Sequence, residues 1–132
     1  MKKVITLVGL SLLLSGCGSS LVCNPPSGEN DVDISYKVKY SGDVVNKVIL
    51  NKTYNFSSKE ELENYTAILN YAKNTESTSN ITIDSKKSGN KYKLIYNYNV
   101  KKMTDDEMSK AGLKHSKTEL VQYLTDSGFT CK

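Results

Sequence analysis

The chain has no arginine and no tryptophan, and its 132 residues include one histidine, two prolines and two phenylalanines. Each of the 18 basic residues is therefore a lysine. Arginine is the side chain best suited to bidentate contacts with phosphate and guanine, so its absence argues against nucleic-acid binding. The nine tyrosines must supply most of the aromatic surface of any core.

Catalytic and metal-binding motifs are missing from the sequence as well. His115 is followed by Ser116 but not by a motif such as G-x-S-x-G, so we interpret it as an exposed loop residue. The acidic run Asp105-Asp106-Glu107 lacks the spacing of a calcium loop, and acids at a helix start have a structural reason. The sequence has no glycine-rich phosphate loop. It therefore predicts a protein that is not an enzyme and that uses no metal or cofactor.

The first residues have the layout of a secretory leader. Lys2 and Lys3 precede an apolar run from Val4 to Leu14, and Leu14-Ser15-Gly16-Cys17 closes it. A charged start, an apolar middle and small residues at the end are typical of a signal peptide. A membrane-spanning helix needs about 20 apolar residues, which is more than this run offers. A buried first strand or helix would not need two lysines directly ahead of it.

The motif Leu14-Ser15-Gly16-Cys17 resembles the lipobox of bacterial lipoproteins, in which cleavage leaves an invariant cysteine at the new N-terminus. The resemblance implies that Cys17 carries a diacylglyceryl thioether. Mature lipoproteins carry at least two acyl chains of the palmitate type, and two chains anchor stably where one does not. We therefore expect a signal peptide over 1–16, a lipid-anchored tether over 17–30 and one domain over 31–132. The domain would lie on the extracytoplasmic face of a cell membrane, inner or outer.

Two cysteines remain once Cys17 is assigned to lipid. In an oxidising compartment the pair Cys23 and Cys131 is most simply interpreted as one disulfide. It would close a loop of about 100 residues, for which chain entropy gives roughly 4–5 kcal/mol. Two free thiols and a redox pair are the alternatives, although catalytic thiols usually form a C-x-x-C that the chain lacks. A short edge pairing at Leu21-Val22 would bring Cys23 to its partner.

Strict alternation of apolar and polar residues begins after Asp31. A period of two predicts a strand with one buried face, which here consists of Val32, Ile34, Tyr36, Val38 and Tyr40. Ser41-Gly42-Asp43 turns the chain into a second strand over Val44 to Phe56. The inward residues of that strand are Val48, Leu50, Tyr54 and Phe56, with Lys52 as an exception.

A helix follows this first hairpin. Ser58 and Glu61 have the spacing of a capping box, in which each side chain bonds the backbone amide of the other. The polar segment Asn74 to Asn80 ends the helix. Its apolar stripe, which should face the sheet, consists of Leu62, Tyr65, Leu69 and Ala72, with Ile68 beside them.

The sequence predicts a second hairpin and two short helices in the remainder. The strands run over Thr78 to Asp84 and Lys91 to Lys101, joined by the turn Lys87-Ser88-Gly89-Asn90. The inward residues of the second strand are Tyr92, Leu94, Tyr96, Tyr98 and Val100. Capping motifs at Thr104 and Ser116 begin helices that end at Gly112 and Gly128, before a last strand over Phe129-Thr130-Cys131.

The element order is β-β-α-β-β-α, with an extra turn of helix before the last. It predicts an α+β domain, with an antiparallel sheet of two β-hairpins and helices packed on one face. This order, the lipobox and the ending Gly128-Phe129-Thr130-Cys131-Lys132 resemble the small bacterial lipoproteins of the YehR-like type. The resemblance implies the same layered domain. It supplies no activity and no catalytic residues.

Lysines alternate with tyrosines along the Lys91 to Lys101 strand. Lys91, Lys93 and Lys101 could hold an anionic polymer while the tyrosines stack on sugar rings or bases. In the simpler interpretation the tyrosines fill the core and the lysines keep the opposite face soluble. We therefore expect a non-enzymatic binding or interaction module of the cell envelope, with an envelope protein or polymer as its partner. The alternative is a small-ligand or anionic-polymer binder that uses the Lys/Asn face.

Overall fold

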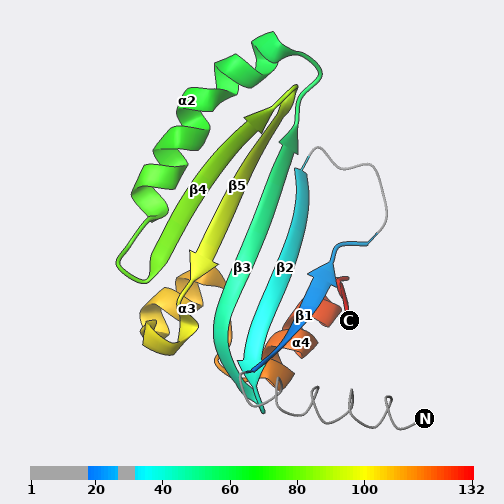
Figure 1. The fold of residues 1–132 in the computed structure, drawn as a ribbon, viewed down its shortest axis with the longest axis vertical. Helices are drawn as coiled ribbons and strands as arrows, with labels where there is room; N and C mark the ends of the chain where they lie inside the picture. The colour runs from blue at the N-terminus through cyan, green and yellow to red at the C-terminus, as the bar shows by residue number, and fades with distance from the viewer. Residues whose placement is uncertain (1–17, 27–31) are drawn as a thin grey trace, which may run out of the picture.

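The computed structural model describes residues 18–26 and 32–132, and the lipobox lies outside them. Six strands form one antiparallel sheet in the order β4-β5-β3-β2-β1-β6 (Figure 1). The strands are β1 (Ser19–Asn24), β2 (Val32–Ser41), β3 (Val44–Asn55), β4 (Ile81–Ser88), β5 (Lys91–Tyr98) and β6 (Thr130–Cys131). The helices are α2 (Lys59–Glu76), α3 (Asp105–Ala111) and α4 (Lys117–Asp126), with a 3₁₀ turn η1 (Val100–Lys102). The α+β class and the antiparallel sheet are therefore confirmed.

The prediction of two hairpins is correct as far as it goes, but the sheet contains two further strands. Hairpins β2–β3 and β4–β5 both form, and β3 pairs with β5 to join them. The sheet then continues beyond β2 through β1 and β6. Residues 17–30 were expected to form a tether, yet β1 occupies Ser19–Asn24. The short edge pairing expected at Leu21-Val22 is therefore correct but too short, because the strand turns only Leu21 and Cys23 toward the core and shows little alternation.

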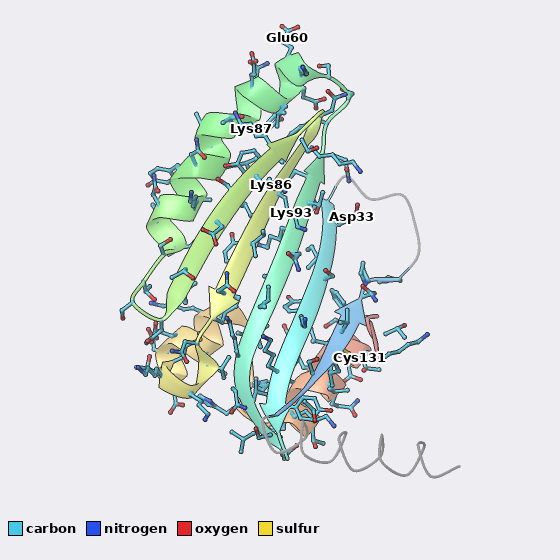
Figure 2. The ribbon with its side chains drawn as sticks, viewed as in Figure 1. Asp33, Glu60, Lys86, Lys87, Lys93 and Cys131 are labelled. Atoms are coloured by element: carbon cyan, nitrogen blue, oxygen red, sulfur yellow. A yellow bond between two sulfur atoms is a disulfide. The ribbon has the colours of Figure 1, made fainter. Side chains whose placement is uncertain are left out.

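One face of the sheet carries the core and the helices. The predicted inward residues of β2, β3 and β5 share this face, and Val38, Val48, Tyr92 and Leu94 are almost fully buried. Leu62 and Leu69 of α2, Met108 of α3, and Leu120 and Leu124 of α4 belong to the same core. We call this side of the sheet the covered face. The other side, the open face, carries the polar residues of the alternation (Figure 2).

A bulge near the start of β3 changes its inward pattern. Lys39 lies opposite Lys47, but the next residue, Tyr40, lies opposite Val45, so Asn46 is the extra residue. Val45 is consequently buried although the alternation of the rest of β3 places it outward. The bulge leaves Lys39 and Lys47 facing each other on the open face.

The helix starts follow the predicted caps with two changes of partner. The Thr104–Glu107 capping box of α3 is present in full, as expected. At α2 the Ser58 side chain accepts from the Glu61 amide, but Glu61 reaches the amide of Ser57 rather than that of Ser58. Ser116 likewise caps α4 by accepting from the Glu119 amide. The acid that completes the start of α4 comes from the β2–β3 turn, as described below.

Two expected patterns were wrong in detail. Tyr65 and the neighbouring Ile68 were expected to face the sheet from α2, but they are 48% and 60% exposed, and only Leu62 and Leu69 are buried along this helix. The strand expected over Lys91 to Lys101 ends at Tyr98, and the chain turns into η1 from Val100. Val100 is fully buried, as its apolar side chain predicted, but it lies in a 3₁₀ turn and not in a strand.

The Cys23–Cys131 disulfide is formed and closes a sequence separation of 108 residues. The two cysteines face each other in the β1–β6 ladder. Backbone hydrogen bonds in both directions between Val22 and Lys132 extend the pairing to the chain end, with N···O distances of 3.0 and 2.9 Å. No helix in the described parts of the chain has the length and apolar character needed to cross a membrane.

Candidate functional site

A groove lies on the covered face between the C-terminal end of α2 and the side of α3. Its volume of about 600 Å³ falls in the range of ligand-sized cavities. The floor comes from β2, β3, β4 and β5, and the walls come from α2, α3 and the loop that follows α2. We call it the tyrosine groove, and its lining includes Ile34, Tyr36, Leu50, Lys52, Tyr96 and Tyr98.

The three tyrosines share one face because the strands that carry them pair in register. Tyr36 lies opposite Leu50, and Leu50 lies opposite Tyr96 on the other side of β3. Tyr96 and Tyr98 stack with ring centres 5.9 Å apart and planes inclined by 11°. Both rings are buried and Tyr36 is half-buried. The sequence alternation thus builds the floor of the groove directly.

Lys52 is the lysine that interrupted the inward pattern of β3, and the structure explains it. Its Nζ lies 4.9 Å from the centre of the Tyr96 ring, a cation–π contact. The long aliphatic stem is half-buried against the floor of the groove. An inward lysine is therefore satisfied by the aromatic face beside it and does not need a carboxylate.

Glu76, in the last turn of α2, forms the opposite wall of the groove. Burial, and then a hydrogen bond to this carboxylate, raise the pKa of the Tyr96 phenol. Burial raises the pKa of Tyr98 as well, with a smaller effect from the charge of Glu76. Both phenols consequently remain protonated at physiological pH and can donate hydrogen bonds.

The charged groups of the α3 wall are engaged with one another and with the backbone. Lys110 pairs with Asp106 at 3.1 Å. Glu107 accepts from the Thr104 amide at 3.1 Å and from the side chains of Asn80 and Thr78. These hydrogen bonds lower the pKa of Glu107, so it is ionised at neutral pH. The groove therefore offers aromatic and aliphatic surface with hydroxyl donors, rather than uncompensated charge.

The three lysines named from the sequence do not form one cluster. Lys91 and Lys93 lie on β5, two residues apart, and Lys101 lies beyond the strand in η1. At about 3.3 Å per residue, β5 and the turn after it separate Lys93 from Lys101 by more than 20 Å of chain. Lys93 faces Lys86 of β4 on the open face, as Figure 2 shows.

The other residues considered from the sequence lie away from the groove. Exposed His115 is 4.0 Å from Asp105, and neither residue lines the groove. Cys17 lies outside the described residues. No cluster of three or more histidine, cysteine or acidic side chains within residues 18–26 and 32–132 could hold a metal ion.

Sequence reasoning missed Glu76 and the role of Lys52. Glu76 belongs to the helix end that the pattern placed among solvated polar residues, and only the packing of α2 against the sheet brings it to Tyr96. The role of Lys52 could have been suspected from the sequence, because a lysine at an inward position of an apolar alternation needs an interaction partner for its charge. The tyrosines were identified, and the core interpretation is correct for all three of them, since Tyr92, Tyr96 and Tyr98 are 1%, 2% and 6% exposed.

The comparisons with known proteins support the fold but give no function. No protein-family model matches the chain, and no curated protein matches it. A solution NMR structure of a protein from Streptococcus pneumoniae TIGR4 is similar, with a TM-score of 0.61 and 9% sequence identity. The similarity covers 87% of this chain and 85% of the pneumococcal chain. At this identity it shows a shared fold alone.

Proposed function

We propose that the mature chain is a lipid-anchored extracytoplasmic protein that binds a component of the cell envelope in the tyrosine groove. The groove carries the proposal, because it is a ligand-sized hollow on the covered face rather than a solvated strand surface. The lipobox at residues 14–17 supports the anchor, and the resemblance to YehR-like lipoproteins agrees with it.

The chemistry of the groove favours an uncharged ligand with apolar faces and polar edges. Its charged side chains are held by partners within the wall, as in the Lys110–Asp106 pair. The protonated phenol of Tyr98 can donate to ether and carbonyl oxygens, whereas the phenol of Tyr96 already donates to Glu76, and the apolar floor can contact ring faces. A glycan segment of the envelope has this combination of groups.

The same features support binding rather than catalysis. Thr78 donates to Glu107 and Tyr96 donates to Glu76 in the groove, but these carboxylates already have structural roles. Glu107 completes the cap of α3, Glu76 holds the Tyr96 phenol, and Asp106 pairs with Lys110. We therefore propose a non-enzymatic role.

The binding proposal is tested by titrating the isotope-labelled mature protein with an oligomer of N-acetylglucosamine. We expect amide shift changes to map to α3, the end of α2 and the centre of β5. Ala111→Phe fills the groove and should weaken binding about tenfold, equal to about 1.4 kcal/mol. Ala67→Phe makes the same change on the exposed side of α2 and serves as the matched control. Equal binding by both variants would refute the hypothesis that the ligand binds in the tyrosine groove.

The alternative is an anionic-polymer site on the open face, and one observation favours it. Lys86 and Lys93 lie directly opposite each other on neighbouring strands, an arrangement that a bound anion would stabilise. Titration with polyphosphate would then shift β4 and β5 amides on that face. Substituting Lys91 and Lys93 by glutamine would remove the effect, whereas Lys101→Gln, in η1, would not.

The anchor is tested separately by mass spectrometry of the membrane fraction. We expect a chain that starts at Cys17 and carries acyl groups, and we expect Cys17→Ser to release the protein from the membrane. A chain that still begins at Met1 with an unmodified Cys17 would end the lipoprotein proposal.

A further inference from the structure

The chain enters the sheet almost directly from Cys17. Gly18 alone separates Cys17 from Ser19, the first residue of β1. Consecutive Cα atoms lie about 3.8 Å apart, so the Cα atoms of Cys17 and Ser19 are within about 8 Å. Gly18 itself packs beside the β2–β3 turn, where an added Cβ would lie 3.3 Å from the Tyr40 carbonyl oxygen. An acyl group on Cys17 would therefore bring this end of the sheet to the bilayer.

We call this region the tethered end: residues 18–20, the β2–β3 turn with the strand residues beside it (39–47), and the start of α4 with the residues before it (114–118). Figure 1 shows that the β2–β3 turn lies at the opposite end of the sheet from the β4–β5 turn. Strand pairing ties the start of α4 to the turn, through the Val44–Ser116 bridge and a 2.8 Å hydrogen bond from the Val45 amide to the His115 carbonyl.

The tethered end carries an uncompensated pair of lysines. Lys39 and Lys47 lie directly opposite each other on the open face. They line a hollow of about 340 Å³ together with Ser19, Ser20 and Asn46. Like charges in this position destabilise a sheet. Among the described residues, the only lysine–carboxylate pair within 4.0 Å is Lys110–Asp106, so no described acid neutralises Lys39 or Lys47.

The acid at the β2–β3 turn is committed elsewhere. Asp43 accepts from the Ser116 hydroxyl at 2.6 Å and from the Thr118 amide at 2.8 Å. Two further lysines approach this end from the start of α4: Lys114 is exposed, and Lys117 lies 4.6 Å from the centre of the Tyr40 ring. The four lysines at this end outnumber its nearby acids Asp43, Asp105 and Glu119, and hydroxyl and amide groups surround Lys39 and Lys47.

We propose that the tethered end docks on the anionic phospholipid head groups of the membrane that holds Cys17, with a lipid phosphate bound between Lys39 and Lys47. This inference rests on the proposed lipid anchor. Each lysine at an anionic surface favours the docked orientation about fivefold. The docked domain would present the β4–β5 turn and the start of α2 to the extracytoplasmic space.

The test uses the acylated protein purified from bacterial membranes and reconstituted into two kinds of vesicle. One contains phosphatidylcholine alone, and the other also contains phosphatidylglycerol. An amine-reactive label and mass spectrometry give the modification of each lysine. We expect labelling of Lys39 and Lys47 to fall about fivefold in the anionic vesicles. Lys59 and Lys87, at the other end of the sheet, should label equally in both.

A pair of matched variants separates docking from simple proximity. The double substitution K39Q/K47Q should abolish the protection of Lys114 in anionic vesicles, while K59Q/K87Q should leave that protection unchanged. Flotation of the vesicles reports the anchor independently. Protein that floats with the vesicles while Lys39 and Lys47 label equally in both lipids would overturn the docking inference alone. Protein that does not float, with an unmodified Cys17, would overturn the anchor and docking together.

Discussion

The two lateral ends of the strand order are held together by different means. We call these ends the local side and the clasped side, and they are distinct from the covered and open faces. The local side consists of α2, β4 and β5, which follow one another in the chain and meet through contacts such as the 2.6 Å hydrogen bond from the Tyr92 hydroxyl to Asn70. The clasped side consists of β1, β6 and α4, where the two ends of the domain meet and the Cys23–Cys131 disulfide joins them. Figure 2 marks Cys131 on the clasped side, away from the helix start at Glu60.

The difference follows from chain entropy. Elements close in sequence lose little conformational entropy when they meet. Joining the two ends of a domain loses more entropy, and here it is balanced only by the short β1–β6 strand pairing. A disulfide lowers the conformational entropy of the unfolded chain, so less entropy is lost when the two ends meet on folding. The tyrosine groove is lined by residues of the local side together with β2, β3 and α3, and by no described residue of the clasped side.

The largest expected effect comes from removing the covalent link. We expect the double substitution C23A/C131A to lower the free energy of unfolding by about 4 kcal/mol, measured by denaturant titration. Amide exchange in the variant should accelerate first in β1, β6 and α4. Exchange that accelerates first in α2 and β4 would break the comparison, because it would make the local side the weaker one.

Core substitutions on the two sides should also differ. Leu120 of α4 is 0% exposed and Leu69 of α2 is 7% exposed. We expect Leu120→Ala to cost about 4 kcal/mol and Leu69→Ala about 2 kcal/mol, because the second cavity can admit water or collapse toward the surface. Calorimetric or denaturant unfolding measures both. A reversed order would show that the local side carries more of the packing energy than burial indicates.

Helix caps allow a smaller comparison, between α2 of the local side and α3, which belongs to neither side. Thr104 has a reciprocal partner in Glu107, and the Ser58 cap of α2 has none. We expect Thr104→Ala to lower stability by about 1 kcal/mol and Ser58→Ala by about half of that. Unfolding curves of both variants, with Ser109→Ala on the exposed side of α3 as the control, would measure the difference. Equal losses would show that reciprocity adds nothing here.

The smallest expected effect depends on pH and is lost in acid. Hydrogen bonds from Ser116 and Thr118 lower the pKa of Asp43. A lowered carboxyl pKa adds stability above the unfolded value of about 3.9, and that stability is lost as the pH falls through the folded value. The stability difference between the wild type and Asp43→Asn should therefore be present at neutral pH and vanish on acidification. The Thr118 amide shift should follow the same titration, and a flat response below pH 4 would contradict it.

Most of the local structure could be predicted from particular residues. The alternation over 32–40 and 91–98 identified the strands and their inward tyrosines, since side chains in a strand alternate between faces. The alternation gave wrong predictions at two places where the backbone departs from a regular strand. Asn46 shifts the register, and Val100 is buried in a 3₁₀ turn instead of a strand. Apolar character predicts burial better than it predicts backbone conformation.

The groove could be predicted only in part. Its floor follows from the alternation of β2, β3 and β5, but its walls do not. Glu76 and Lys110 reach the groove because α2 and α3 pack on the same face with the groove between them. That distance depends on the packing of many side chains at once, for which a single sequence carries no periodic signal.

The strands from β2 to β5 and the helix starts could be predicted from the amino-acid sequence, because periodicity and capping motifs are local properties. The Cys23–Cys131 disulfide was the simplest of several interpretations, and the structure confirms it. Only the folded domain defines the order of the strands, the place of β1 within the sheet and the contact between Asp43 and the start of α4. These features join residues far apart in the chain, such as Asp43 and Thr118. Their partners are selected by the free energy of the whole packed domain rather than by neighbouring residues.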